Sequence, residues 1–143
     1  MPYAVRSAEP RDLAGIASLL APDSPPAELK AAWDQTMRTA NITVYVSESA
    51  EDVVGTATLT VMPHITYGCR PTAFIEAVHV TPSHRRRGVA RMLLTTILRD
   101  ARGMGCHKVQ VVSHKRHHDD GGHALYRSIG FNDEAEGFRV YLD

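Results

Sequence analysis

Hydrophobic and polar positions recur along the chain with two different periods, which predicts a mixture of strands and helices. Alternating or β-branched runs predict strands over residues 3–6, 42–47, 53–61, 72–80 and 108–113. Apolar residues three or four apart predict a helix from Pro10, a second around Leu29 and Trp33, a long one over Gly88–Arg102 and a short one over His123–Ile129. After Phe131, the alternation of Phe138, Val140 and Leu142 predicts one or two closing strands.

The order of these elements predicts the fold class. One strand is followed by two helices, three strands, a helix, a strand, a helix and the closing strands. This order indicates an α/β (α+β) fold with a mixed central sheet of six to seven strands and helices on both faces. A length of 143 residues suits a single domain that spans 1–143.

Composition excludes some classes of partner. The formal net charge is zero and 22% of the residues are charged, so we expect no nucleic-acid partner and no anionic membrane partner. No apolar run approaches the length of a membrane span, and the polar N-terminus lacks a signal-peptide core. Cys69 and Cys106 show no metal-ligand spacing and are expected to be reduced thiols. These features predict a cytoplasmic protein.

The segment from Phe74 to Leu94 contains the clearest candidate chemistry. An apolar strand leads into a turn with three arginines, Arg85–Arg87, then Gly88, and then the long helix. Free N–H groups in a first helical turn, the helix dipole and nearby guanidinium groups favour a phosphate or pyrophosphate. The chain has neither G-x-x-x-x-G-K-[ST] nor G-x-G-x-x-G, so a P-loop or dinucleotide site is not indicated. A solvated basic turn is the plain alternative.

Three stretches carry a family resemblance. Arg85-x-x-Gly88-x-Ala90 resembles the Gln/Arg-x-x-Gly-x-Gly/Ala acetyl-CoA motif of the GNAT superfamily of N-acetyltransferases. Residues 125–131, LYRSIGF, resemble the (F/L)Y-x-x-x-GF signature on the last helix of that family. Residues 75–80 and 105–109 are similar to stretches in small GNAT enzymes, glucosamine-phosphate N-acetyltransferases among them. The resemblance covers nearly the whole chain and implies the GNAT fold, with a mostly antiparallel sheet.

The resemblance also implies a reaction and a cofactor site. It implies acetyl-CoA as co-substrate, direct attack of a primary amine on the thioester, and no metal. The pantetheine arm would lie along Val78, His79 and Val80, paired with the main chain of Val78 and Val80. The pyrophosphate would lie against Arg85, Arg86, Arg87, Gly88, Val89, Ala90 and Arg91.

Two side chains are candidates for proton transfer. Tyr126 would contact the cofactor and protonate the departing thiolate as a general acid, although a core tyrosine is the plain alternative. Glu76 would take the proton of the attacking amine, although a surface salt bridge is equally compatible with the pattern. Strand alternation predicts that His79 points to the opposite face from Glu76, as a packed residue.

The acceptor is less constrained by the sequence. His64, Tyr67 and Arg70 precede the fourth strand and are expected to line its pocket. A small amine or amino sugar is preferred, since no acidic run suits a basic peptide. A protein or peptide N-acetyltransferase, a non-catalytic acyl-CoA sensor and a homodimer remain open. His114, His117, His118 and Asp119 match no familiar zinc spacing, so a solvated loop is the preferred interpretation.

Overall fold

The computed structural model describes residues 2–118 and 120–143. Two compact units make up the chain, the first ending at Val111 and the second running from Val112 to Asp143. The first unit contains the sheet and three of the four α-helices, and the second contains the remaining α-helix.

One open sheet of five strands forms the centre of the first unit, in the order β1-β2-β3-β4-β5. The strands are β1 (Ala4–Ser7), β2 (Ile42–Ser49), β3 (Asp52–Met62), β4 (Thr72–Val80) and β5 (Lys108–Val111). Neighbouring strands are antiparallel except β4 and β5, which are parallel. The five strands predicted before Phe131 are therefore confirmed, as is the mixed, mostly antiparallel sheet.

The four predicted helices are also present. They are α1 (Leu13–Leu20), α2 (Pro26–Arg38), α3 (Val89–Gly103) and α4 (Gly122–Ile129). Short 3-10 turns occupy Pro10–Asp12, Tyr67–Cys69, Pro82–His84 and Lys115–His117. Among the described residues, no helix has the length and apolar composition needed to cross a bilayer.

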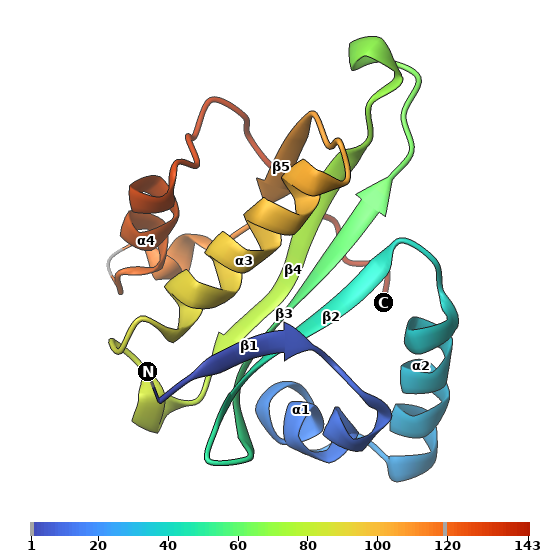
Figure 1. Cartoon of the computed structure of the whole chain (residues 1–143), viewed down its shortest axis with the longest axis vertical. Coiled ribbons are helices and arrows are strands. Elements are labelled where there is room, and N and C mark those ends of the chain that lie inside the picture. The colour runs from blue at the N-terminus through green and yellow to red at the C-terminus, as the bar shows by residue number, and fades with distance from the viewer. Residues whose placement is uncertain (1, 119) are drawn as a thin grey trace. The chain divides into compact units, whose positions relative to one another are not determined.

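Helices cover both faces of the sheet in the first unit (Figure 1). On one face, Ile16 of α1 and Trp33 of α2 pack with Val44 and Val46 of β2. Tyr45 lies between these valines and points the other way, where its hydroxyl donates to Asp100 of α3 at 2.8 Å. The alternation of β2 therefore separates an α1/α2 face from an α3 face.

Close packing positions the start of α3. A Cβ on Gly55 of β3 would lie 2.9 Å from a methyl carbon of Val89 and 3.2 Å from one of Leu93. Both of these α3 side chains are buried. A glycine in β3 thus allows the first turn of α3, where the candidate anion site begins, to rest directly on the sheet.

The prediction of six to seven strands is wrong, because residues 131–143 form no strand. The side chains of Phe138, Val140 and Leu142 are 93%, 78% and 94% exposed. Their alternation has the period of a strand, but a strand also needs a hydrogen-bonding partner and a surface to cover. Neither is present for these side chains within the described part of the chain.

An ion-pair network joins β1 to the segment before α1. The guanidinium of Arg6 donates to the two carboxylate oxygens of Asp12 at 2.7 and 3.0 Å, and to Glu48 of β2 at 3.1 Å. Asp12 is only 5% exposed. Because Arg6 favours its ionised form, the pKa of Asp12 is lowered.

The hairpin between β2 and β3 contains local strain that can be relieved. Its two turn residues, Ala50 and Glu51, have φ angles of 50° and 72°. Such two-residue hairpin turns favour Asn-Gly or Asp-Gly. We expect Glu51→Gly to raise the free energy of unfolding by about 1 kcal/mol, since glycine has no Cβ penalty there. Thermal denaturation would measure this gain. Ser49→Gly, in the adjacent strand, should destabilise instead, and an equal effect of the two substitutions would contradict the explanation.

Candidate active site

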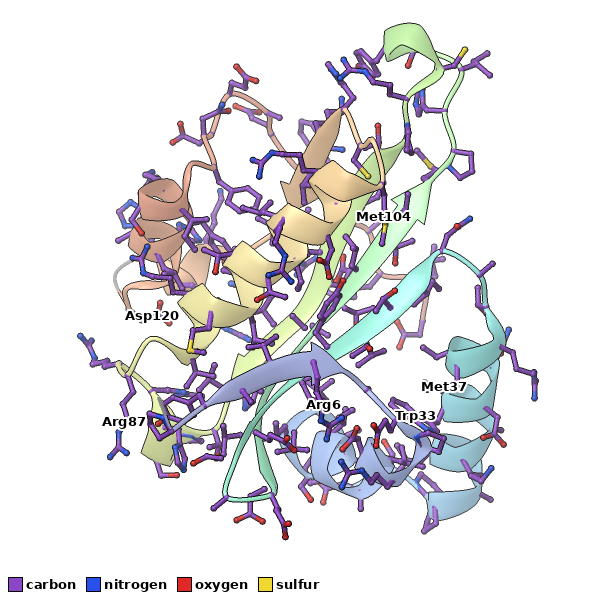
Figure 2. All side chains as sticks on the ribbon, in the orientation of Figure 1. Arg6, Trp33, Met37, Arg87, Met104 and Asp120 are labelled. Carbon is purple, nitrogen blue, oxygen red and sulfur yellow. The ribbon has the colours of Figure 1, made fainter. Side chains whose placement is uncertain are left out.

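The turn between β4 and α3 leaves the start of the helix without a side-chain cap. Gly88 immediately precedes α3 and has a φ of 84°, a left-handed conformation that glycine adopts without strain. No side chain caps the N–H groups of the first helical turn, so they are available to a ligand. Arg85 donates from Nε to the carbonyl of Val80 at 3.0 Å, which ties the turn to the end of β4. Arg87 projects from the turn away from the sheet (Figure 2).

A contact from the N-terminal strand holds this turn. The hydroxyl of Tyr3 lies 2.9 Å from Nδ1 of His84, and the two rings meet edge to face. Tyr3 is buried, with 8% of its surface exposed. Sequence reasoning missed this pair because 81 residues separate its members and neither belongs to a motif.

Strand β4 has an unpaired stretch on the side of β5. The parallel pairing covers Thr72–Ile75 and Lys108–Val111, and no strand of the described residues continues it beyond Ile75. A bulge follows, in which Ala77 has a φ of 55° and the register with β3 shifts. The main chain of residues 76–80 is therefore available to an extended ligand on that side.

The bulge overturns one prediction. Glu76 pairs with Thr58 of β3, and His79 pairs with Thr56. Thr56 and Thr58 are two residues apart in one strand and lie on one face of the sheet, so Glu76 and His79 also share a face. Simple alternation had placed them on opposite faces, because it did not include the extra residue in the bulge.

The shared face is the α1/α2 face, since Thr56 and Thr58 pair with Val46 and Val44 of β2. Glu76 is exposed there, and His79 is half-buried. Burial, and to a smaller extent the charge of Arg85, lowers the pKa of His79.

Tyr126 belongs to the second unit, on α4. The helix starts at Gly122, whose N–H donates to Asp120 at 3.0 Å, so a carboxylate supports the glycine pair at the helix start. The Tyr126 ring packs edge to face with Phe131, with 5.7 Å between ring centroids. Burial raises the pKa of Tyr126, and its hydroxyl has no hydrogen-bond partner among the described residues. A protonated, unengaged phenol is suited to donate a proton.

The three residues predicted to line the acceptor pocket lie before β4. His64 lines a shallow pocket of about 320 Å³ together with Cys69. Tyr67 stacks on His107 with ring centroids 4.3 Å apart, and Lys108 donates to its hydroxyl at 3.2 Å. Arg70 lies 2.6 Å from Nδ1 of His107.

His107 and Lys108 were missed as companions of Tyr67 and Arg70. Their signals were the family resemblance of residues 105–109 and their position at the start of the strand that pairs with β4, and neither signal indicated a contact with Tyr67 or Arg70. Tyr67 and Cys69 have φ angles of 53° and 61°, so this loop is held in a strained conformation. Among the described residues, no carboxylate forms an ion pair with Arg70 or Lys108.

The histidine-rich loop shows internal contacts. His117 pairs with Asp120, and His114 accepts a hydrogen bond from the N–H of Arg116 at 3.0 Å. Asp119 lies outside the described residues. No group of three or more potential ligands that could hold a metal occurs in the part of the chain that the structure describes.

The first unit thus brings together the Arg85–Gly88 turn, the start of α3 and the β4 residues Glu76 to Val80. The predicted acceptor residues lie at the opposite end of β4. Tyr126 is part of the second unit.

Comparisons with known proteins identify the family. The family model described as Acetyltransferase (GNAT) family matches residues 12–131. A glucosamine 6-phosphate N-acetyltransferase of Trypanosoma brucei brucei is 29% identical over 96% of this chain and 95% of its own. An aminoglycoside N(6')-acetyltransferase type 1 of Acinetobacter genomosp. 13 is 23% identical, over 85% of this chain and 84% of its own.

A solved structure shows the same fold. The crystal structure of a Trypanosoma brucei acetyltransferase superposes with a TM-score of 0.84 at 29% identity, covering 98% of this chain and 99% of that one. The matched segment contains both the Arg85–Gly88 turn and Tyr126. The chain therefore belongs to the GNAT family of acetyltransferases.

Proposed function

We propose that the protein transfers an acetyl group from acetyl-CoA to a primary amine by direct attack of the amine on the thioester. The uncapped start of α3 behind Arg85–Gly88 is the observation that carries this proposal, because it offers amide donors and guanidinium groups to a pyrophosphate. The pyrophosphate contacts are Arg85, Arg86, Arg87, Gly88, Val89, Ala90 and Arg91. The family model spans both units, which supports one catalytic domain over residues 1–143.

The roles of the other residues follow the path of the cofactor. The pantetheine arm lies along Val78, His79 and Val80, where the main chain lacks a strand partner on one side. Main-chain N–H groups of β4 stabilise the developing oxyanion. Tyr126 contacts the cofactor and protonates the thiolate as it leaves, and Glu76 attracts the acceptor amine to the place where its proton is removed.

The acceptor is proposed to be an amino sugar or another small amine. The relatives named above act on glucosamine 6-phosphate and on aminoglycosides. His64, Tyr67 and Arg70 are proposed to contact the far end of the acceptor, with His107 and Lys108 beside them. Arg70 and Lys108, which form no ion pair with a described carboxylate, would repel a polycationic aminoglycoside and attract an anionic group, which favours a phosphorylated amino sugar.

The location of the protein, its oligomeric state and its alternative functions belong to the same proposal. Cys69 and Cys106 are free thiols, which supports a cytoplasmic enzyme. A homodimer is compatible with this function. Acetylation of proteins or peptides and non-catalytic acyl-CoA sensing are the alternatives for the same site, and a peptide acceptor in the assay below addresses the first of these two.

A thiol-release assay with acetyl-CoA would test the proposal. The acceptors would be glucosamine 6-phosphate, glucosamine, an aminoglycoside and an amino-terminal peptide. We expect turnover with glucosamine 6-phosphate above the others. Arg70→Met should raise KM for the phosphorylated sugar about tenfold, because a charge-assisted hydrogen bond is lost, and should leave KM for glucosamine nearly unchanged.

Arg102→Met, on the exposed end of α3, is the matched control and should change neither value. Equal effects of Arg70→Met on the two sugars would contradict the anion contact. Failure of the wild-type protein to bind acetyl-CoA in calorimetry would overturn the proposed function itself.

A further inference from the structure

His79 differs from the other histidines in its contacts. The chain has eight histidines, and seven of them have a described polar or ring partner. These are His64 with Thr66, His84 with Tyr3, His107 with Arg70, His114 with Arg116, His117 with Asp120, His118 with His123, and His123 with Ser113. Within the described residues, the ring of His79 has no hydrogen bond, ion pair or ring contact. A half-buried polar group without a partner is uncommon and suggests a ligand.

The strand register places His79 next to the candidate base. His79 and Glu76 pair with Thr56 and Thr58, which lie two residues apart on β3. Same-face neighbours along a strand are separated by about 7 Å. An acceptor ammonium or one water fits between side chains that start from these positions. The Ala77 bulge creates this arrangement, since an unbulged strand would turn one of the two side chains to the α3 face.

The charges around His79 keep its ring neutral. Arg85 lies close enough to disfavour a second positive charge, and partial burial acts in the same direction. Helix α1, which packs on this face of β3 and β4, has no charged side chain between Leu13 and Leu20. Arg6 occupies the same cross-strand row on β1, but its charge is engaged by Asp12 and Glu48. Glu76, opposite Thr58 in the adjacent cross-strand row, is the one acidic side chain of β4.

We propose that His79 takes the proton from the acceptor ammonium, while Glu76 attracts and orients that ammonium by its charge. The inference rests on the proposed transferase activity and names the base within it. The ammonium gives one proton to an imidazole nitrogen of His79, and the neutral amine then forms the C–N bond as the C–S bond breaks. Tyr126 gives its proton to the thiolate and regains one from the nitrogen of the new amide. His79 releases its proton to water, so the cycle is balanced.

The pH dependence of kcat/KM tests this assignment. In the wild-type enzyme, the acidic limb of kcat/KM should lie below the ordinary imidazole value of 6.5, because His79 must be neutral and its pKa is lowered. His79→Gln should lower kcat/KM about a hundredfold and remove this acidic limb. Glu76→Gln should raise KM for a cationic acceptor and retain the limb. His114→Gln is the matched control, since this histidine is exposed and accepts a hydrogen bond from Arg116, and it should also retain the limb.

A second acceptor separates proton removal from other roles. An alkoxyamine is neutral at pH 7 and needs no base before it attacks. The defect of His79→Gln should therefore nearly disappear with an alkoxyamine and persist with an alkylamine. An equal defect with both acceptors, or an unchanged acidic limb in His79→Gln, would overturn the assignment.

Binding and folding are measured in parallel. CoA affinity by calorimetry and thermal unfolding of His79→Gln should match the wild type. A variant that loses activity together with CoA affinity or folding would show that His79 supports the cofactor site instead, and would overturn its role as base. A wild-type protein without transferase activity would refute the proposed function, which is a different outcome.

Discussion

Replacing Tyr126 by phenylalanine is expected to lower kcat about a hundredfold or more, because general acid catalysis typically contributes a factor of this size. The phenylalanine ring keeps the edge-to-face contact with Phe131 and removes only the hydroxyl. Affinity for CoA should change far less than kcat. Thiol release measured against pH gives a second readout. Because the pKa of Tyr126 is raised by burial, the alkaline limb of wild-type kcat should lie above the ordinary tyrosine value of 10, and the variant should lack it.

Tyr141→Phe is the matched control, since Tyr141 lies in the same unit and is 74% exposed. It should leave kcat and its pH profile unchanged. If Tyr126→Phe and the wild type turned over equally, the tyrosine would be structural. If both bound CoA and neither acetylated any amine, the non-catalytic sensor would become the better interpretation of the same cofactor site.

Replacing Arg6 by methionine is expected to cost about 3 kcal/mol of unfolding free energy at pH 7, because it leaves Asp12 ionised and nearly buried without its partner. For a domain of this size, this loss corresponds to a decrease in melting temperature of roughly 10 °C. Arg11→Met removes an ion pair between two exposed side chains and should change stability little. Denaturant titrations of the wild type, Arg6→Met and Arg11→Met would measure the three unfolding free energies.

The stability lost in Arg6→Met should become smaller as the pH falls. In the wild type, the folded-state pKa of Asp12 lies below its unfolded value of 3.8. The contribution of Asp12 is therefore fully present above that value and is lost as the pH falls through the folded value. In Arg6→Met, the guanidinium that lowers this pKa is absent, so the variant loses less stability than the wild type on acidification. A stability difference that stayed constant from pH 7 to well below pH 3.8 would contradict this explanation.

Much of the fold could be predicted because its signals are local. The period of Val89, Leu93 and Ile97 predicts α3, and all three side chains are buried there. The range of β4 is as predicted, and the glycine turn before α3 has the left-handed residue that its motif requires. The closing strands were not predictable in this way. The alternation of Phe138, Val140 and Leu142 reports a period, whereas strand formation depends on a partner far away in sequence.

In the candidate site, too, some features follow from local sequence signals and others depend on tertiary structure. The segment Arg85–Gly88 could be singled out from the sequence, because the proposed anion site needs its glycine and arginines in one short segment. The shared face of Glu76 and His79 could not be predicted, since it depends on a one-residue bulge at Ala77. Alanine rarely adopts a positive φ angle, so this residue type gives no sign of the bulge. The Tyr3–His84 contact and the stacking of Tyr67 on His107 depend on tertiary packing alone.

The unpaired stretch of β4 has a consequence for inhibition and resistance. A compound that pairs with residues 76–80 as an added strand would be recognised through main-chain amides and carbonyls, which every residue type except proline supplies in full. Ordinary side-chain substitutions could not remove those contacts. Resistance would require a change of backbone geometry at Ala77, or a proline in the strand, and either change would also damage the surface proposed to hold the natural cofactor.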